Sequence, residues 1–334
     1  MVIQEFYENY WGRIESRFID IINKGNPPPS VIEIVLYHFK NPGKRMRSFL
    51  STGLLLCFNP KISEGELDFA ASVELLHNAS LIHDDLEDQD FYRRGELNVW
   101  KKYSPVQAIN IGDLIFIKSI EILLASEISE NIKLQLIRRT MLAINELILG
   151  QMLEISFRDT MNMTWNDWEN IAAQKTGALF RLIFEGVFLI SGIDIQTCGD
   201  ELKGIGRVMG ILYQMRDDLI DAMGLKEGRR QGSDVLEGKI TCLSIKAIEK
   251  GVEKAQIVRE MLLNSEQSDH DSRINRLIEL YESQGILSEL QKFFSGLLDQ
   301  CRSHPIIIKF PQIKPAYNNF LNMLEIRDKK RGES

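Results

Sequence analysis

The sequence predicts an all-α fold, and three observations favour it. No proline occurs between Pro105 and Pro305, and such a run is typical of long helices because proline interrupts them. Apolar residues recur at steps of three and four, which places them on one face of a helix. No repeat and no low-complexity linker divides the chain, so we expect a single domain over residues 1–334. The clearest apolar stripes are Leu75, Ala79, Ile82 and Leu86; Ile137, Met141, Ile144 and Ile148; and Leu212, Met215, Leu219 and Ala222.

The N-terminal part is expected to form four helices. A turn containing Pro42 and Gly43 precedes the third of them, and Ser63 with Glu66 forms a capping box that begins the fourth. The four helices are predicted at about residues 2–23, 31–39, 44–58 and 63–88.

The remainder is expected to contain four long helices and a shorter helical tail. They are predicted at about residues 105–125, 127–158, 165–192 and 199–223. Arg93, Arg94 and Gly95 fall in a loop before the first of these, and residues 224–238 form a glycine-rich charged loop after the last. Three or four shorter helices follow, broken by the polar stretch at 264–272.

Composition limits the class of protein. The chain has 334 residues, of which 44% are hydrophobic, enough for a sizeable core, and its net charge of −7 argues against a nucleic-acid binder with a broad basic surface. Its four cysteines form no CxxC pair, which favours a reducing compartment over a zinc site or a disulfide framework. No apolar stretch approaches the roughly 20 residues of a membrane span, and the first 13 residues lack the apolar core of a signal peptide. We therefore expect a cytoplasmic protein.

A first cluster of acids ends the fourth predicted helix. Asp84 and Asp88 are four residues apart, so both carboxylates leave the same side of the helix, and Asp85 lies beside them. The apolar stripe lies on the opposite side. A helix C-terminus carries partial negative charge, so acids are unfavourable there and a bound cation would compensate.

A second cluster repeats this pattern. Gln214, Asp217, Asp218 and Asp221 share one face of an apolar helix near its end. A single DDxxD string is as readily a solvated helix end, but two copies, each followed by a basic loop, favour a functional site. Carboxylates are hard ligands suited to Mg²⁺, whose coordination substrate phosphates complete.

Basic residues accompany both clusters. Lys44 and Arg47 open a helix after a turn, where backbone N–H groups and the helix dipole favour an anion. Any one basic pair is more simply a solubilising charge, but together with the acids they indicate a polynuclear metal and diphosphate site. The other candidates are Arg93, Arg94, Lys175, Arg229, Arg230 and Lys239.

These motifs together resemble one family. Gly-Lys-Arg-x-Arg, His-x-x-Ser-Leu-Ile-His-Asp-Asp-x-x-Asp, Arg-Arg-Gly, Gly-Asp, Gly-Gln, Lys-Thr, Gln-x-x-Asp-Asp-x-x-Asp and Gly-Ser-Asp-x-x-x-Gly-Lys-x-Thr occur in this order over about residues 40–245. The order and spacing are similar to those of trans-isoprenyl diphosphate synthases, the polyprenyl synthetase family, and particularly to geranylgeranyl diphosphate synthases. Leu97 and Trp100 replace the proline and histidine that often follow Arg-Arg-Gly, so we expect a local change in that loop.

The resemblance implies the isoprenoid synthase fold, with antiparallel helices around a deep central cavity, and usually a homodimer. It also implies roles for the residues that match. Isopentenyl diphosphate would bind Lys44, Arg47, His77 and Arg94. Mg²⁺, three ions per site with Mn²⁺ as a substitute, would bind Asp84, Asp85, Asp88, Asp217, Asp218 and Asp221. Arg93, Lys175, Arg230 and Lys239 would contact the allylic diphosphate, and Thr176 and Gln214 would face the reacting carbons.

The implied reaction is a chain elongation. Ionisation of the allylic diphosphate gives a cation, which the double bond of isopentenyl diphosphate attacks before a proton is lost. Ala79 and Ser80, just before the first acid cluster, are small, which suggests a deep cavity and a product of C20 or longer. Phe116 and Ile148 are deeper candidates for its floor, although each taken alone is more simply an ordinary core residue.

Two other functions fit parts of the pattern. A class I terpene cyclase would keep the acid clusters but would not need Lys44, Arg47, His77 and Arg94. A regulatory subunit of a heteromeric synthase would lack some of the acids, and this chain retains them all.

Overall fold

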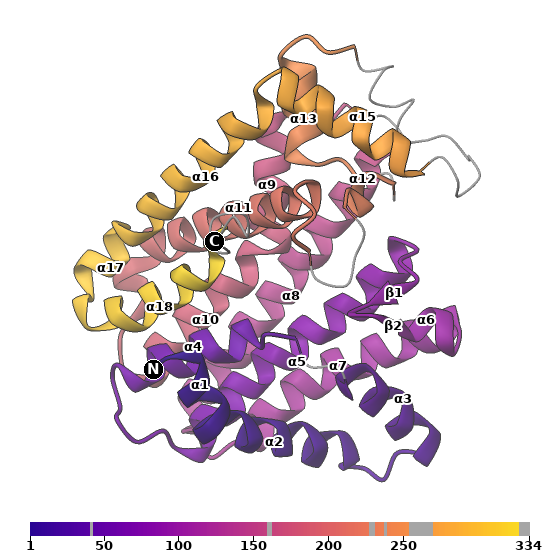
Figure 1. Ribbon diagram of the computed structural model, residues 1–334. Coiled ribbons are helices and arrows are strands. Elements are labelled where there is room, and N and C mark those ends of the chain that lie inside the picture. The colour runs from indigo at the N-terminus through magenta and orange to yellow at the C-terminus, as the bar shows by residue number, and fades with distance from the viewer. Residues whose placement is uncertain (41–42, 159–161, 227–230, 237–238, 254–269, 327–334) are drawn as a thin grey trace.

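The computed structural model describes residues 1–40, 43–158, 162–226, 231–236, 239–253 and 270–326. Within them the chain is helical apart from one short hairpin, so the predicted all-α class is confirmed (Figure 1). The main elements are α1 (Ile3–Phe6), η1 (Tyr7–Trp11), α2 (Gly12–Asn23), α3 (Pro29–Lys40), α4 (Met46–Leu56), α5 (Glu64–Glu87), β1 (Tyr92–Arg93), β2 (Glu96–Leu97), α6 (Val99–Lys102), α7 (Pro105–Ala125), α8 (Glu130–Arg158), α9 (Trp165–Lys175), α10 (Gly177–Ile190), η2 (Ile195–Cys198) and α11 (Gly199–Ala222). The C-terminal part contains α12 (Ser233–Leu236), α13 (Cys242–Glu249), α15 (His270–Ser283), α16 (Ile286–Arg302), α17 (Pro305–Lys309), η4 (Pro311–Ile313) and α18 (Lys314–Leu324).

Local sequence signals account for where several helices begin. The Ser63 hydroxyl accepts a hydrogen bond from the Glu66 backbone N–H, and the Glu66 carboxylate accepts one from the Ser63 N–H, so the predicted capping box begins α5. The Ser104 hydroxyl accepts a hydrogen bond from the Gln107 backbone N–H and so caps α7, with Pro105 at the first helical position. The first predicted helix contains a π-helical turn, η1, which joins α1 to α2.

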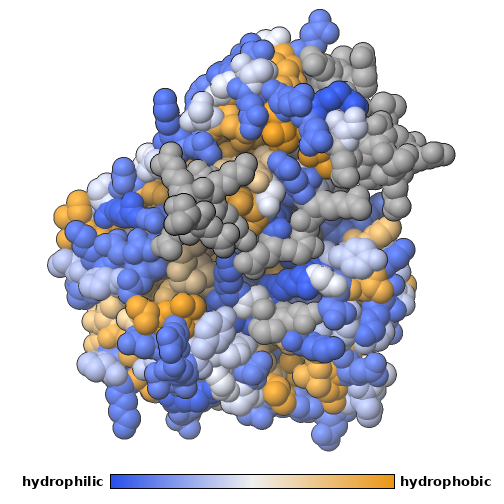
Figure 2. All heavy atoms as spheres, in the orientation of Figure 1, coloured by the Kyte–Doolittle hydropathy of each residue, from blue (hydrophilic) through white to orange (hydrophobic). Residues whose placement is uncertain are grey.

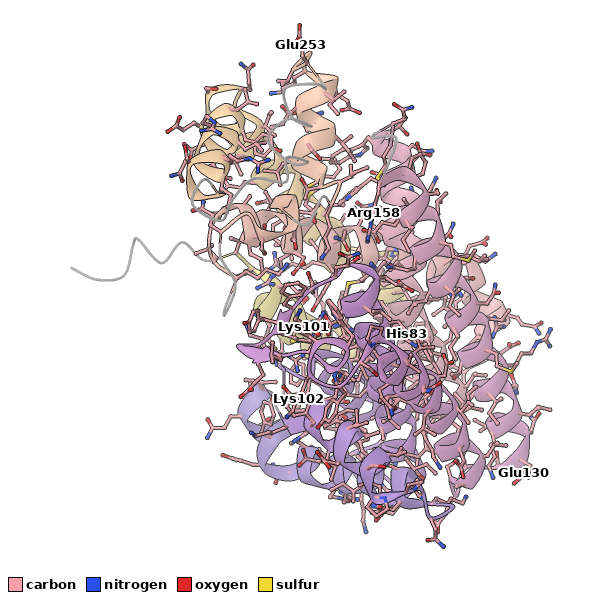
Figure 3. The ribbon with its side chains drawn as sticks, turned by 90° about the vertical axis from the view of Figure 1, so that its right-hand side faces the viewer. His83, Lys101, Lys102, Glu130, Arg158 and Glu253 are labelled. Carbon is pink, nitrogen blue, oxygen red and sulfur yellow. The ribbon has the colours of Figure 1, made fainter. Side chains whose placement is uncertain are left out.

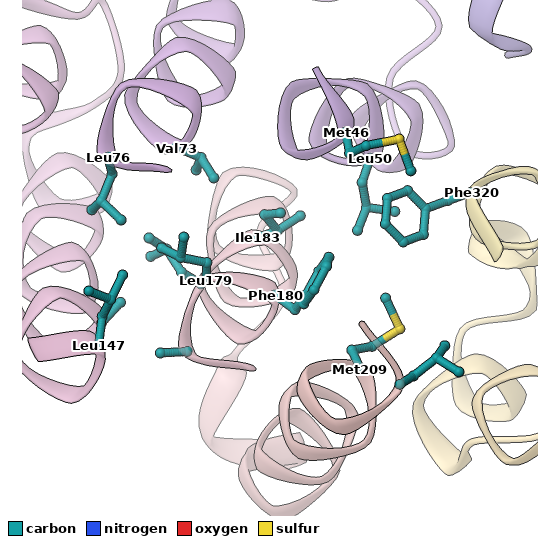
Figure 4. Close-up of a cluster of buried hydrophobic side chains, with 14 of the residues drawn as sticks. Met46, Leu50, Val73, Leu76, Leu147, Leu179, Phe180, Ile183, Met209 and Phe320 are labelled. Carbon is teal, nitrogen blue, oxygen red and sulfur yellow. The ribbon is translucent and has the colours of Figure 1, made fainter. Parts of the chain in front are cut away.

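The core forms around α5 and α10. Helix α5 packs along α7 and against α4, while α10 packs against α4, α8 and α11. Phe180, Phe184 and Phe188 recur every four residues along α10 and are fully buried. The backbone of α10 passes so close to Phe69 of α5 that a Cβ on Gly186 would lie 2.1 Å from that ring. Figure 4 shows part of this core, in which α4, α5, α10, α11 and α18 contribute side chains.

The predicted helix at 165–192 is divided into α9 and α10. Thr176 separates them, with φ −98° and ψ −40°. The break follows from tight packing on α11, because a Cβ on Gly177 would lie 2.5 Å from the Gly206 carbonyl oxygen. One on Gly210 would lie 2.5 Å from the Ala172 carbonyl oxygen. Close backbone approach at these three glycines thus bends the chain at the Lys175–Thr176 pair.

The predicted apolar stripes differ in how deeply they are buried. Those of α5 and α11 are confirmed as core, since Leu75, Ala79, Leu212 and Leu219 are fully buried. The stripe of α8 is only partly buried, because Met141 is 58% exposed and Ile148 is 44% exposed, while Ile137 and Ile144 are half-buried against the core. Helix α8 runs along the outside of the molecule, with Glu130 and Arg158 at its two ends (Figure 3).

The surface carries both polar and apolar side chains. Figure 2 shows a face on which hydrophilic side chains predominate and apolar side chains occur in separate patches. No helix in the described parts of the chain is long and apolar enough to cross a membrane.

Candidate active site

A pocket of about 310 Å³ lies among α5, α8, the α9–α10 break and α11. One water needs roughly 10–15 Å³ on this scale, so the pocket admits a molecule far larger than a solvent cluster. Most of the site residues expected from the sequence line it together. They are Arg47, His77, Asp84, Asp88, Arg93, Arg94, Lys175, Thr176, Gln214, Asp217, Asp218 and Lys239.

Four predicted site residues are not among those lining the pocket. Lys44 is exposed. Asp85 and Asp221 are each 2% exposed and point into the surrounding structure. Arg230 falls outside the described residues.

Helix α5 supplies the first acidic wall. His77, Leu81, Asp84 and Asp88 follow one another at helical spacing on its pocket side. Burial, together with the charges of Asp88 and Glu154, raises the pKa of Asp84 to about 6 although Lys175 opposes this. The negative charge of ionised Asp84 is therefore not fully balanced by the cations around it.

The α9–α10 break delivers a cation to this wall. Lys175 Nζ lies 2.8 Å from a Glu154 carboxylate oxygen and 3.6 Å from Asp84 Oδ1. Burial would lower the pKa of Lys175, but Asp84, Glu154 and Asp88 outweigh burial and raise it. Lys175 is thus held as a cation between α5 and α8.

Asp88 at the end of α5 is neutralised by two cations. It pairs with Arg158 of α8, and Lys239 Nζ lies 2.9 Å from its Oδ2. Burial opposes ionisation, but Lys239, Lys175 and Arg158 outweigh it and lower the pKa of Asp88 to about 2. Asp88 is therefore a carboxylate at all physiological pH values.

Helix α11 supplies the opposite acidic wall. Asp217 Oδ2 lies 2.8 Å from Lys226 Nζ, and Lys226 also contacts Asp234 at 3.0 Å. Burial and the charges of Asp234 and Asp217 raise the pKa of Asp218 to about 8. Burial and Asp234 likewise raise the pKa of Asp221 to about 6.

Asp221 organises the loop that follows α11. Its Oδ1 accepts a hydrogen bond of 2.6 Å from the Ser233 hydroxyl, and its Oδ2 accepts one of 3.2 Å from the Asp234 backbone N–H. Asp221 therefore fixes the Gly-Ser-Asp segment and with it the acid that Lys226 and Lys239 share.

The Arg-Arg-Gly segment is the end of a hairpin, where the sequence had predicted a loop. Arg93 pairs with Glu96 across β1 and β2, which leaves Arg94 and Gly95 as a two-residue turn with φ of 55° and 83°. Positive φ at both positions is typical of the hairpin turns that match strand twist. Arg93 Nε donates to both oxygens of Asp85, at 2.8 and 2.9 Å. Asp85 thus positions Arg93 at the edge of the pocket.

Arg94 packs against the turn before α4. A Cβ on Gly43 would lie 2.2 Å from Arg94 Nη2, so only glycine leaves room for this guanidinium. Arg45, which follows Lys44, has φ of 49° and is 2% exposed. Its guanidinium lies 4.5 Å from the Trp11 ring centroid and 3.5 Å from Glu74, away from the pocket.

A second cationic group lies between α5 and α11, beside the acid clusters. Arg47 Nη1 lies 3.2 Å from His77 Nε2 and donates to the Tyr213 hydroxyl at 3.3 Å. Because arginine only donates, His77 Nε2 must accept and carry no proton. Burial and the neighbouring arginines lower the pKa of His77 well below its usual value, which keeps the imidazole neutral.

The donor set fits a metal bound jointly with a substrate. No group of three His, Cys, Asp or Glu side chains in the described residues is arranged to hold a metal unaided. Mg²⁺ typically binds one or two carboxylates and completes its shell with water and substrate phosphates. The raised pKa values of Asp84 and Asp218 indicate carboxylates whose ionised form a further cation would stabilise.

Several residues of the site were not predicted. Glu154 follows the Gly-Gln motif by one helical turn, a spacing that could have identified it. Asp234 belongs to the Gly-Ser-Asp motif, and Tyr213 directly precedes Gln214. Lys226 carries no motif signal. All four line the pocket.

Comparisons with known proteins agree on one family. The family model for polyprenyl synthetase matches residues 28–281. Farnesyl diphosphate synthase of Micrococcus luteus is 33% identical over 237 residues, 69% of this chain and 80% of that protein. Geranylgeranyl diphosphate synthase of Sulfolobus acidocaldarius is 28% identical over 312 residues, 88% of this chain and 91% of that protein.

Solved structures agree with the fold. Geranylgeranyl pyrophosphate synthase of Corynebacterium glutamicum, complexed with isoprenyl diphosphate and magnesium, superposes with a TM-score of 0.82 at 22% identity. The match covers 98% of this chain and 100% of that one.

Replacing Gly43 tests the position of Arg94. In Gly43→Ala, the new methyl group displaces the flexible guanidinium rather than the backbone, so we expect little change in melting temperature. Inorganic diphosphate should bind about tenfold more weakly by calorimetry, as expected for one lost charge-assisted contact. Gly12→Ala, at a glycine with open space around it, is the control. Equal weakening in both variants would refute the role of Arg94.

Proposed function

The chain belongs to the polyprenyl synthetase family, and we propose that its pocket joins isopentenyl diphosphate to an allylic diphosphate to give a longer trans-prenyl diphosphate. It is a prenyltransferase. One observation carries the assignment of the site, namely that both acid clusters and the Arg47–His77–Arg94 group line the same pocket. Two diphosphates of different roles can therefore lie side by side in it.

The allylic diphosphate belongs on the acidic side. Asp84, Asp88 and Asp217 face the pocket and would hold Mg²⁺, while Asp85 and Asp221 support them from behind. Mg²⁺ bound there supplies Lewis-acid stabilisation of the leaving diphosphate. We propose three ions per site, with Mn²⁺ as a substitute.

Cations of the chain take up the charge that develops. As the allylic C–O bond breaks, its electron pair leaves with the diphosphate, and Arg93, Lys175 and Lys239 lie at the pocket wall to stabilise it. Arg230, outside the described residues, is proposed for the same role, which Lys226 can also fill.

Isopentenyl diphosphate belongs beside the group formed by Arg47, His77 and Arg94. Arg47 and Arg94 provide positive charge, and neutral His77 can donate from Nδ1 while its Nε2 faces Arg47. Lys44 is exposed, so we propose that it reaches the diphosphate only after substrate binds.

The reacting carbons lie between the two sides. The isopentenyl double bond attacks the allylic cation and forms the new C–C bond, and the resulting cation loses a proton. Thr176 and Gln214 line the pocket and can stabilise positive charge through their dipoles without forming a covalent adduct. We assign the proton to the departed diphosphate. Leu147 and Leu179 help to exclude water, which would trap the cation.

Two alternatives are less consistent with the site. A class I terpene cyclase would not need the group of Arg47, His77 and Arg94 that lines the pocket beside the acid clusters. A regulatory subunit would not need complete acid clusters.

The decisive assay incubates labelled isopentenyl diphosphate with an allylic diphosphate and Mg²⁺. Elongated product is expected, whereas a cyclic hydrocarbon formed from geranylgeranyl diphosphate alone would favour the cyclase.

Removing a metal-binding carboxylate should abolish catalysis without unfolding the protein. Asp217→Asn keeps the size of a side chain that is 40% exposed, so the melting temperature should hardly change. We expect kcat for elongation to fall by about 10²- to 10³-fold, since metal and electrostatic stabilisation are lost. Asp299→Asn, at a site 78% exposed on α16, is the control. Elongation that persists in EDTA would contradict the metal role outright.

The end of the pocket suggests how product length is set. Ser80, Leu147 and Leu179 line it, and Leu76 converges on the two leucines from α5 (Figure 4). Ala79 is fully buried and is not among the lining residues, and Ile148 points outward. Phe116 is half-buried, with its ring 5.6 Å from that of His83. We therefore propose Leu147 and Leu179 as the floor, and geranylgeranyl diphosphate, C20, as the main product.

Variants at the floor should change the product. Leu147→Ala removes a side chain from the floor and should lengthen the product, and Ser80→Phe should shorten it, when products are sized by chromatography after phosphatase treatment. Ile148→Ala, at the neighbouring but outward residue, is the control. If Ile148→Ala lengthens the product and Leu147→Ala does not, the floor is misassigned.

A homodimer would cover the exposed apolar face of α7 and α8. Large apolar side chains are exposed along both helices. A large exposed apolar surface favours contact with a partner protein, which removes it from water. They are Val106, Ile109, Ile117 and Leu124 on α7, and Leu134, Met141, Leu142, Ile148, Leu149, Met152 and Ile155 on α8.

All four cysteines are free, which suits the reducing cytoplasm where we place the protein.

Charges on this face should dissociate the dimer. We expect wild-type protein to sediment as a dimer and the double variant Met141→Lys, Met152→Lys to sediment as a monomer, because two lysines cannot be buried unpaired. The control is Ile308→Lys, which places a lysine at another exposed apolar residue, on α17. A wild-type monomer at micromolar concentration would refute the proposal.

A further inference from the structure

Tyr281 of α15 carries a buried hydroxyl that the proposed reaction does not use. The side chain is 1% exposed, and among the described residues its oxygen has no hydrogen-bond partner. Buried hydroxyls are almost always bonded to protein or to ordered water. Burial, with Cys242 and Asp218 nearby, raises the pKa of Tyr281, so the phenol keeps its proton and remains a donor.

A small cavity adjoins this hydroxyl. Its volume is about 10 Å³, and Tyr281, Asp218, Asp221 and Thr241 provide its polar lining. Apolar side chains of α15, including Ile274 and Leu277, close the remainder. A single water needs roughly 10–15 Å³ on this scale and two to four polar partners. The cavity is lined mainly by apolar side chains, but its volume suits one water and its few polar groups can supply the partners.

The carboxylates on the other side retain capacity to accept. Asp218 accepts hydrogen bonds from the Cys242 backbone N–H at 2.7 Å and from Gln214 Nε2 at 3.1 Å. Asp221 accepts from the Ser233 hydroxyl and the Asp234 N–H. Each carboxylate offers about four acceptor positions. One water can thus accept from Tyr281 and donate a hydrogen to each carboxylate.

The contact between α15 and the Gly-Ser-Asp loop is tight at this point. A Cβ on Gly232 would lie 2.9 Å from Ile274 Cγ2, so α15 rests directly on the loop that Asp221 holds. Asp218 lines both the small cavity and the large pocket. Any shift of Tyr281 relative to α11 would therefore be felt at a carboxylate of the second acid cluster.

We propose that Tyr281 holds a structural water against Asp218 and Asp221 and thereby positions the second acid cluster for its cation. Tyr281 is a positioning residue, because it reaches the site only through the water and the carboxylates. Hydrogen bonds from the water would add to those from Cys242 and Ser233 and fix the orientation of the two carboxylates. The role in metal binding rests on the proposed function, but the water site does not.

The water site is tested by crystal structures of the metal-free protein and of Tyr281→Phe. This substitution retains the ring and removes only the hydroxyl. We expect an ordered water within hydrogen-bond distance of Tyr281 Oη and of Asp218 or Asp221, and its loss or displacement in the variant. An empty cavity in the wild-type protein would overturn the proposal, whether or not the protein elongates prenyl chains.

The positioning role is tested by calorimetric titration of Mg²⁺ in the presence of inorganic diphosphate. We expect Tyr281→Phe to weaken Mg²⁺ binding about three- to tenfold, the effect of one hydrogen bond. Tyr317→Phe is the matched control, since Tyr317 is also fully buried and its hydroxyl contacts Met209 at 2.9 Å, away from the acids. Unchanged Mg²⁺ affinity in Tyr281→Phe, or equal loss in both variants, would show that Tyr281 only packs.

Discussion

The structure depends on the balance of charge between two acidic helix ends that face each other across one pocket. Asp84 and Asp88 end α5, and Asp217 and Asp218 lie near the end of α11. Helix dipoles, burial and mutual repulsion all disfavour these carboxylates, as the raised pKa values of Asp84 and Asp218 indicate. The chain balances them with lysines and arginines from other elements. In the function we propose, those cations also bind the diphosphate, so one arrangement would serve both the folded protein and its reaction.

The rest of the fold positions these cations. Close glycine contacts between α9–α10 and α11 bend the chain so that Lys175 enters the pocket. The hairpin of β1 and β2 holds Arg93 and Arg94 at the pocket, and Asp85 orients Arg93 by accepting hydrogen bonds from it. Asp221 fixes the loop whose Asp234 is shared by Lys226 and Lys239. Acids that do not face the pocket therefore contribute by orienting side chains that do.

The sequence predicted most of this arrangement because its strongest signals are local. Helical spacing placed Asp84 with Asp88, and capping residues located the start of α5. The bend at Thr176 could not be predicted, since it results from backbone contacts with Gly206 on a distant helix. The exposure of Met141 and Ile148 on α8 could not be predicted, because periodicity identifies an apolar face but not what covers it. Lys226 was missed because its partners are apparent only once α11 and the following loop are folded together.

If the site works as proposed, the cations that balance the acids transfer to the substrate when metal and diphosphate bind. A crystal structure with Mg²⁺ and an unreactive allylic diphosphate analogue tests it most directly. We expect Lys226 to leave Asp217 and Lys239 to leave Asp88, and both lysines to contact phosphate oxygens while the carboxylates face the metal. Lysines still paired with the same carboxylates, with the diphosphate bound elsewhere, would contradict it.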